Sequence, residues 1–373
     1  NFTRTGQGDI LGKIDIGGLR LENDLGKYDI GDISLTSHTA GSQRKVRLNS
    51  SFADGAYNGT ASVGKFVKDL KDITFRKEIP ALFSDQGTEW AGNSYELYFR
   101  CHDSMDIMSF VIPGIYIADS TSLNMNITPE GILTTQLKSP RIAYREQYMK
   151  GVKVSLDNTN DRISGEMNCN EIRAASLILK DNRFQILAED NHVGAGYSYE
   201  NSGELLNRGE FVLVSDFFRN EEGVNIGMEI LPTTLHLNSR EWNIEPSKIH
   251  ISGSGIDVES LELTSSEQRV RLEGKASKAA KDTPTLNLDR FDISVVNPLI
   301  GSKFGIAGAA TGDVRLISPL KELGLLANMI SDSTYIAGVP LGVVSIGSSW
   351  NEEFERFEID LRNDYSGKSN ISA

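Results

Sequence analysis

The chain has 373 residues, of which 39% are hydrophobic, and it carries a formal net charge of −13 at pH 7. The acidic balance argues against nucleic acid as a partner, because binding to phosphates depends on an excess of Lys and Arg. The modest apolar content favours a thin, extended body over one large compact core. No apolar run of about 18 residues occurs, so the sequence predicts no transmembrane helix within it.

The amino-terminal segment predicts short strands. Between residues 9 and 48, three runs of alternating apolar and polar residues are separated by clusters of Gly, Asn, Asp and Ser. This alternation is typical of strands joined by turns. We expect residues 1–75 to form one strand-rich segment. The chain opens within this pattern and without a secretion leader, so we also expect it to be a piece of a longer protein.

The pattern changes between Lys65 and Ile117. Residues 66–75 are amphipathic, and residues 103–117 carry apolar side chains closer to helical spacing until Pro113 and Gly114 interrupt them. We expect one or two short helices near residues 62–115 and a cap or insertion over residues 76–145. A helical cap protects an open sheet end from aggregation; a patch that docks a partner is the alternative interpretation.

Strand patterns resume at Ser122 and are clearest after Trp242. There the apolar side chains fall largely at two-residue spacing, which places them on one face of successive strands. We expect residues 146–373 to form the main sheet region. The side chains that we expect on the apolar face are Ile249, Ile251, Ile256, Val258, Leu261, Leu263, Val270 and Leu272, together with Ile14 and Ile16 of the amino-terminal segment.

No residue pattern predicts catalysis. Among the 51 acidic residues, the adjacent pairs lie in polar segments that are typical of turns, so none is indicated as a catalytic pair. No Gly-x-Ser-x-Gly motif occurs. Gly194 and Gly196 precede neither a Lys-Ser/Thr pair nor a helix pattern, as a phosphate loop requires. Cys101 beside His102 has no second pair at zinc-like spacing. We therefore expect the protein not to be an enzyme and to bind neither a metal nor a cofactor. The sequence does not decide whether Cys101 and Cys169 form a disulfide.

The carboxy-terminal sequence resembles a known family. Residues 286–350 contain, in order, an LxLxxFDI segment, a short NPLI turn, a small-residue strand that ends in GDVRL, a Pro-Leu connector and a strand leading to an aliphatic turn. This order resembles the repeat region of TamB proteins of the AsmA-like superfamily, particularly those of Bacteroidetes. The resemblance extends over residues 224–363, where Trp242, Pro246 and Ile249 match the tandem unit. It is weaker over residues 9–63 and poor over residues 65–142.

The resemblance implies both a fold and a function. TamB proteins are elongated all-β proteins whose repetitive, solenoid-like sheet folds along its length into an apolar trough, called a β-taco. A non-enzymatic periplasmic bridge is therefore implied, anchored in the inner membrane by an N-terminal helix outside this sequence. It would reach a TamA-like assembly barrel in the outer membrane. The implied cargo is phospholipid, whose acyl chains lie in the groove, or nascent outer-membrane protein.

The ten aliphatic residues named above are the expected lipid groove. Keeping an acyl chain from water is worth about 0.8 kcal/mol for each CH₂, so a continuous apolar trough carries lipid by passive shielding. The alternative for the same residues is an ordinary closed core between two sheets. Two other classes also stay open, namely an exported β-scaffold or adhesin and a polysaccharide-binding β-helix.

Overall fold

The computed structural model describes residues 2–4, 10–84, 90–174, 177–201, 206–237, 239–277, 282–297, 305–317, 324–351 and 356–365. Most of these residues form antiparallel β-strands, and the same ranges contain two short α-helices. The expected all-β class with short helices near residues 62–115 is therefore confirmed. The chain divides into unit 1, residues 1–173 and 178–197, and unit 2, residues 174–177 and 198–373. The boundaries expected near 75 and 145 both lie inside unit 1.

Unit 1 is built mainly from strands that pair with their neighbours in sequence. The order β1-β2-β3-β4-β5-β6-β8-β9-β10-β11 is antiparallel throughout, and the short β7 pairs with the end of β9. The strands are β1 Phe2–Arg4, β2 Ile10–Asn23, β3 Gly26–Ala40, β4 Gln43–Ser50, β5 Ala53–Gly59, β6 Tyr95–Cys101, β7 Ile115–Ile117, β8 Ser122–Ile127, β9 Leu133–Tyr144, β10 Gln147–Asp157, β11 Ile163–Ala174, β12 Leu177–Glu189 and β13 His192–Asn201. Short 3-10 helices span Pro80–Leu82 and Thr159–Asp161.

The sequence explains the tight turns of this sheet. At the β2–β3 turn, the Oδ1 atom of Asn23 accepts hydrogen bonds from the backbone N–H of Leu25 at 2.9 Å and of Gly26 at 3.2 Å. Asn side chains stabilise turns in this way because they satisfy backbone donors two and three residues further on. The chain therefore reverses where the alternation of apolar residues stops.

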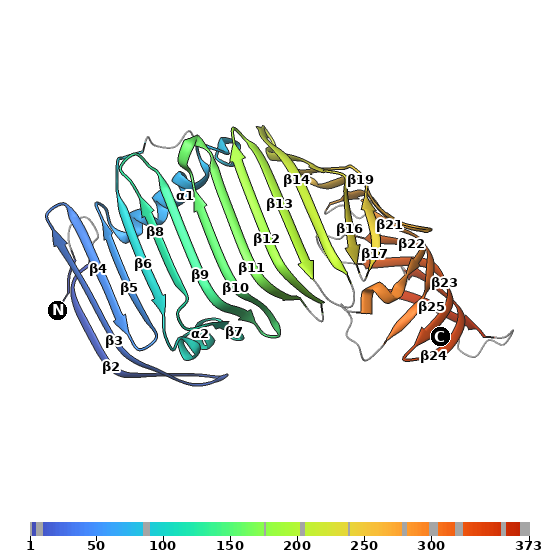
Figure 1. Cartoon of the computed structure of the whole chain (residues 1–373), viewed down its shortest axis with the longest axis horizontal. Coiled ribbons are helices and arrows are strands. Elements are labelled where there is room, and N and C mark those ends of the chain that lie inside the picture. The colour runs from blue at the N-terminus through green and yellow to red at the C-terminus, as the bar shows by residue number, and fades with distance from the viewer. Residues whose placement is uncertain are drawn as a thin grey trace. The chain divides into compact units, whose positions relative to one another are not determined.

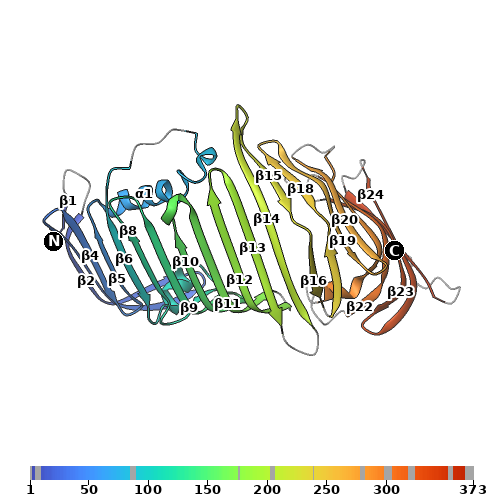
Figure 2. The same ribbon diagram turned by 45° about the horizontal axis from the view of Figure 1, so that its top comes forward.

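Two helices lie at opposite ends of the unit 1 strands. Helix α1, Val63–Phe75, follows β5, and helix α2, Met105–Val111, follows β6 and ends before Pro113. The Oγ of Ser62 accepts from the backbone N–H of Lys65 at 3.2 Å and so caps α1. Figure 1 shows α1 behind the upper ends of β6 and β8 and α2 at the lower ends of the strands, and Figure 2 shows α1 along the same upper ends. Because β5 and β6 are neighbours within the sheet, α1 covers part of a sheet face and not a sheet end.

Unit 2 contains a meander with one split. The strands β19 to β25 pair successively, whereas β14 pairs with both β15 and β16, and β19 pairs with both β18 and β17. The strands are β14 Asn207–Asn220, β15 Gly223–Ile230, β16 Thr233–Leu237, β17 Arg240–Ile244, β18 Ser247–Ser252, β19 Gly255–Ser265, β20 Gln268–Ala276, β21 Thr285–Asp292, β22 Ile306–Ile317, β23 Gly324–Ile336, β24 Val339–Asn351 and β25 Arg356–Asp364, with a 3-10 helix at Ile293–Val296. The β16–β17 hairpin supplies the buried core of Leu235, Trp242 and Ile244.

Within the described ranges, no helix is long and apolar enough to span a bilayer.

Candidate functional site

One face of unit 1 carries a continuous row of apolar positions from β2 to β11. Each member lies directly opposite the next in the strand register, so the row crosses the strands without a break. We call it the floor row: Ile14, Leu35, Leu48, Gly55, Phe99, Leu123, Leu137, Val154 and Met167. Every residue in it is half-buried, and Gly55 is the one member without a side chain, so the row stays accessible to solvent.

The other face of the same strands is polar. The residues on either side of Leu137 are Gln136 and Lys138, and both are exposed. Alternate residues of a strand point to opposite faces of the sheet. The sheet of unit 1 therefore has one wetted polar face and one apolar face.

Helix α1 covers one margin of the apolar face. Phe66 and Ile73 of the helix pack on Tyr95, Ile127 and Leu133 of the strands, and these five side chains are buried. Partly buried residues from the next row contact this cluster, among them Val46, Leu97, Met125 and Leu156. The aromatic rings of Phe66 and Tyr95 lie edge to face with centroids 5.2 Å apart. The floor row lies beyond this covered margin and remains open.

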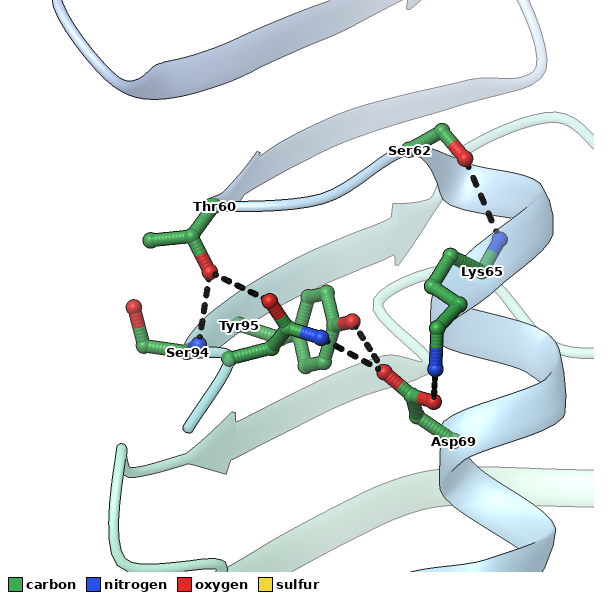
Figure 3. Close-up of polar contacts among 7 residues, drawn as sticks. Thr60, Ser62, Lys65, Asp69, Ser94 and Tyr95 are labelled. Atoms are coloured by element: carbon green, nitrogen blue, oxygen red, sulfur yellow. Dashed lines mark hydrogen bonds and ion pairs between the residues drawn. The ribbon is translucent and has the colours of Figure 1, made fainter. Parts of the chain in front are cut away.

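A polar network fixes α1 to the sheet (Figure 3). Asp69 of α1 is 3% exposed and forms an ion pair with Lys65 one turn earlier. The Tyr95 hydroxyl donates to Asp69 at 2.5 Å and the Asn93 amide at 3.1 Å. The Thr60 hydroxyl donates to Asn93 at 3.3 Å and accepts from the backbone N–H of Ser94 at 2.9 Å. Burial and the neighbouring Asp69 carboxylate raise the pKa of Tyr95, which keeps this hydroxyl a donor.

The segment after α1 holds a buried carboxyl group. Glu78 is 1% exposed, and neither of its carboxylate oxygens has a hydrogen-bond partner among the described residues. Its carbonyl oxygen accepts from the backbone N–H of Asn191 at 2.8 Å, and the Asn191 side chain accepts from the N–H of Ala81 at 2.8 Å. Burial raises the pKa of Glu78, and the nearby Asp161 adds to the rise while Lys77 opposes it. This segment therefore contains a group that is costly to ionise.

A line of small buried residues bounds the floor row on its other side. It comprises Ala53, Cys101, Thr121, Ser139, Val152 and Cys169, and we call it the crease. Next to it, Gly31 and Gly151 adopt φ values of 76° and 65° inside β3 and β10, a backbone region that favours glycine. Figure 1 shows the lower ends of β10 and β11 curving away from the line of their upper parts. Small side chains suit such a bend because the neighbouring strand segments approach closely there.

Unit 2 repeats the arrangement of apolar rows. One row runs in register through Ile244, Leu263, Val270, Leu288, Gly312, Met329, Ile346 and Leu361. A second joins Leu261, Leu272, Leu286, Val314 and Ala327. In the first row only Ile244 is buried, and the second row has no buried member. The described part of unit 2 contains no α-helix, so none covers these rows there.

The ten residues expected in the groove lie on apolar sheet faces, and none of them is buried. Ile249 pairs with Val258 and Ile251 with Ile256, while Leu261 pairs with Leu272 and Leu263 with Val270. A bulge between Val258 and Leu261 keeps both side chains on one face although they are three positions apart. Ile14 begins the floor row, and Ile16 lies opposite Ile33 and is 39% exposed.

The structure also shows what the sequence prediction missed. Leu261, Leu263 and Val270 contact the buried core around Trp242, so part of the expected groove lining also supports the core. Most of the floor row was not assigned to the site, although Leu133–Tyr144 carries the alternation that could have revealed it. Asp69 and Glu78 gave no sequence signal, because both lie among mixed Lys, Asp and Glu residues that are typical of an exposed surface.

A polar hollow lies on unit 2. It is lined by Asp216, Glu229, Lys248, His250, Asp257 and Glu259 together with four other residues, among them Met228 and Ile249. In the strand register, Glu229 lies opposite Lys248 and His250 lies opposite Asp257. This hollow brings together carboxylates of three strands, namely Asp216 of β14, Glu229 of β15, and Asp257 and Glu259 of β19.

The cysteines are both free and buried, and burial raises the pKa of each thiol. Within the described ranges, no three His, Cys, Asp or Glu side chains are placed to hold a metal ion.

No protein-family model matches the chain, and no significantly similar curated protein or solved structure was found.

Proposed function

We propose that the chain shields the acyl chains of phospholipids from water, as a non-enzymatic periplasmic bridge of the TamB kind between the inner and outer membranes. The floor row is the observation that carries this proposal. It is continuous, accessible and apolar, and the opposite face of the same strands is polar. An acyl chain laid along it gains about 0.8 kcal/mol for each CH₂ withdrawn from water.

The proposal includes partners that the resemblance implies. An inner-membrane anchor would precede this sequence, and a TamA-like barrel would receive the cargo at the outer membrane. Nascent outer-membrane protein is the second possible cargo, because extended apolar segments need the same shielding. The reaction is physical transfer and needs no catalytic group.

Site-specific photocrosslinking tests the proposal. A photoreactive amino acid at Leu137 or Val258 reports on the apolar faces of unit 1 and unit 2, and the same group at Gln136 or Asp257 reports on the polar faces. We expect phospholipid adducts at Leu137 and Val258 and none at the controls, detected by mass spectrometry of protein purified from membranes. Adducts at all four positions, or at none, would contradict a lipid-bearing apolar face.

A charge placed on the floor row tests the same proposal through the amount of lipid that the protein binds. Leu137→Asp puts a carboxylate where an acyl chain would lie, whereas Gln136→Asp puts the same charge on the polar face. We expect the first variant to lose co-purified lipid and the second to retain it, with matching circular dichroism spectra. If Leu137→Asp unfolds the protein, then Leu137 belongs to a closed core and the face is not open.

The polar hollow of unit 2 favours a second candidate function, the binding of polysaccharide. Glu229 and Asp257 lie on its wall with His250 and Lys248, and such polar groups can hydrogen-bond sugar hydroxyls. Binding to a polysaccharide array distinguishes the two functions. Retention of a glycan that is lost in Asp257→Asn, with unchanged lipid content, would favour the second candidate.

A further inference from the structure

A cluster of basic and aromatic side chains lies across the crease from the floor row. The guanidinium of Arg141 lies over the rings of Tyr148 and Tyr116, at 4.8 and 5.9 Å from their centroids. The Lys150 ammonium lies 4.6 Å from the Tyr148 centroid and bonds the Glu171 carboxylate at 2.7 Å. The Tyr148 hydroxyl donates to the same carboxylate at 2.6 Å. We call these five residues the rim cluster.

The strand register places the rim cluster on the same sheet face as the floor row. Arg141 lies opposite Lys150, and Lys150 lies opposite Glu171. Each is four positions from a floor-row residue on its own strand, namely Leu137, Val154 and Met167. An even separation keeps side chains on one face, and four residues span at most about 13 Å, the length of an unbent strand. The distance suits an amphiphile with an apolar tail on the floor row and a polar head at the rim cluster.

The charges of the cluster do not cancel. Lys150 is neutralised by Glu171, whose carboxylate also accepts the Tyr148 hydroxyl. Arg141 is exposed, and its guanidinium has no carboxylate partner among the described residues. Stacking on aromatic faces leaves the in-plane N–H donors of a guanidinium free, and these donors match the oxygens of a phosphate. The cluster therefore presents one uncompensated positive charge.

We propose that Arg141 binds the phosphate group of an amphiphile whose apolar tail lies on the floor row. This inference rests on the proposed lipid-shielding function and adds to it the residue that would recognise the phosphate of the headgroup. Tyr116 and Tyr148 hold the guanidinium in place and supply amphipathic rings at the boundary between apolar and wet surface. Lys150 contacts the Tyr148 ring, and Glu171 accepts the Tyr148 hydroxyl, so both help to hold this ring.

Binding of two short-chain lipids tests the inference. Dihexanoyl phosphatidylglycerol carries a phosphate and dihexanoylglycerol does not, and both are titrated into the full chain below their micellar concentrations. We expect Arg141→Gln to weaken the phosphatidylglycerol complex about tenfold, because a charge-assisted hydrogen bond is lost, and to leave dihexanoylglycerol unchanged. Arg141→Lys keeps the charge but loses the planar stacking, so it should recover only part of the affinity.

The control variant is Arg100→Gln, which removes an exposed Arg that lies between the floor-row residue Phe99 and Cys101 and so points to the polar face. It should change neither affinity. Unchanged phosphatidylglycerol binding in Arg141→Gln, or equal loss of both lipids, would overturn the phosphate role. Inorganic phosphate that binds the wild-type chain as tightly as the lipid would also overturn it, since the site would then serve a free anion. If the wild-type chain binds neither lipid, the proposed function itself fails.

Discussion

The two units build similar apolar rows but protect them differently. Unit 1 covers one margin of its apolar face with helix α1, which a buried carboxylate fastens to β6. Unit 2 uses strand side chains alone, and its buried core comes from the β16–β17 hairpin. In both units most of the row members remain half-buried. The comparison shows that an accessible apolar face needs a separate, buried source of stability, and that a helix or a hairpin can supply it.

The largest effect should come from the core of unit 2. Trp242 is 2% exposed and packs with Leu235 and Ile244. We expect Trp242→Ala to cost about 4 kcal/mol of unfolding free energy, because a large cavity opens where no helix can fill it. Hydrogen exchange during denaturant unfolding should show the loss in unit 2 and not in unit 1. A simultaneous loss in both would mean that the units unfold as one body and would break the comparison.

The next effect concerns the attachment of α1. Asp69→Ala removes the acceptor of Tyr95 and Asn93 and the partner of Lys65, so we expect a cost of about 3 kcal/mol, confined to unit 1. Tyr95→Phe removes one hydroxyl and should cost about 1 kcal/mol. Hydrogen exchange of residues 63–75 measures both changes. An Asp69→Ala variant as stable as Tyr95→Phe would show that packing, and not the polar network, holds α1.

Glycine replacements sharpen the contrast between sheet and helix. Gly312 in β22 has φ 149°, and a methyl group there would overlap the carbonyl oxygen of Asn328 on β23. We expect Gly312→Ala to destabilise unit 2 by about 2 kcal/mol. Gly64 in α1 has open space around it, so Gly64→Ala should stabilise unit 1 by about 0.5–1 kcal/mol. Thermal unfolding of both variants tests the opposite signs.

The smallest expected effect is a pH dependence of unit 1. The pKa of Glu78 is raised by burial, so the folded state retains this proton at pH values where the unfolded chain releases it. The contribution of Glu78 to stability is therefore full below its ordinary value near 4.5, and it falls as pH rises from there through the raised folded pKa. We expect Glu78→Gln to flatten this dependence and to stabilise unit 1 at pH 7. An unchanged pH profile would assign the dependence to other groups.

Sequence periodicity predicted the all-β class and the positions of both helices, because each depends on local spacing. Residues 66–75 and 103–112 carry helical patterns, the second of which ends before Pro113, and α1 and α2 lie there. Two-residue alternation also identified the apolar side chains of β18 to β20. None of the ten expected residues is buried, although Leu261, Leu263 and Val270 also contact the core around Trp242.

The remainder of the site depended on information that one sequence does not hold. The floor row is assembled by the register of nine strands, and the alternation within one strand does not show which residue of the next strand lies opposite. The side of the sheet that α1 covers depends on long-range packing of Phe66 on Tyr95. The rim cluster forms only because β7 pairs with the end of β9, which brings Tyr116 beside Arg141. The alternation within either strand does not predict this pairing.

The successive pairing of strands has a mechanical consequence. From β2 to β5 and from β19 to β24, each strand is hydrogen-bonded to the strands before and after it in the sequence. Most contacts in these segments therefore join neighbouring strands. A force applied to one edge strand acts first on the hydrogen bonds to its single neighbour, so the strands would detach one after another. Such a sheet can also gain or lose a hairpin without changing the partners of the strands further away, which makes its length adjustable in evolution.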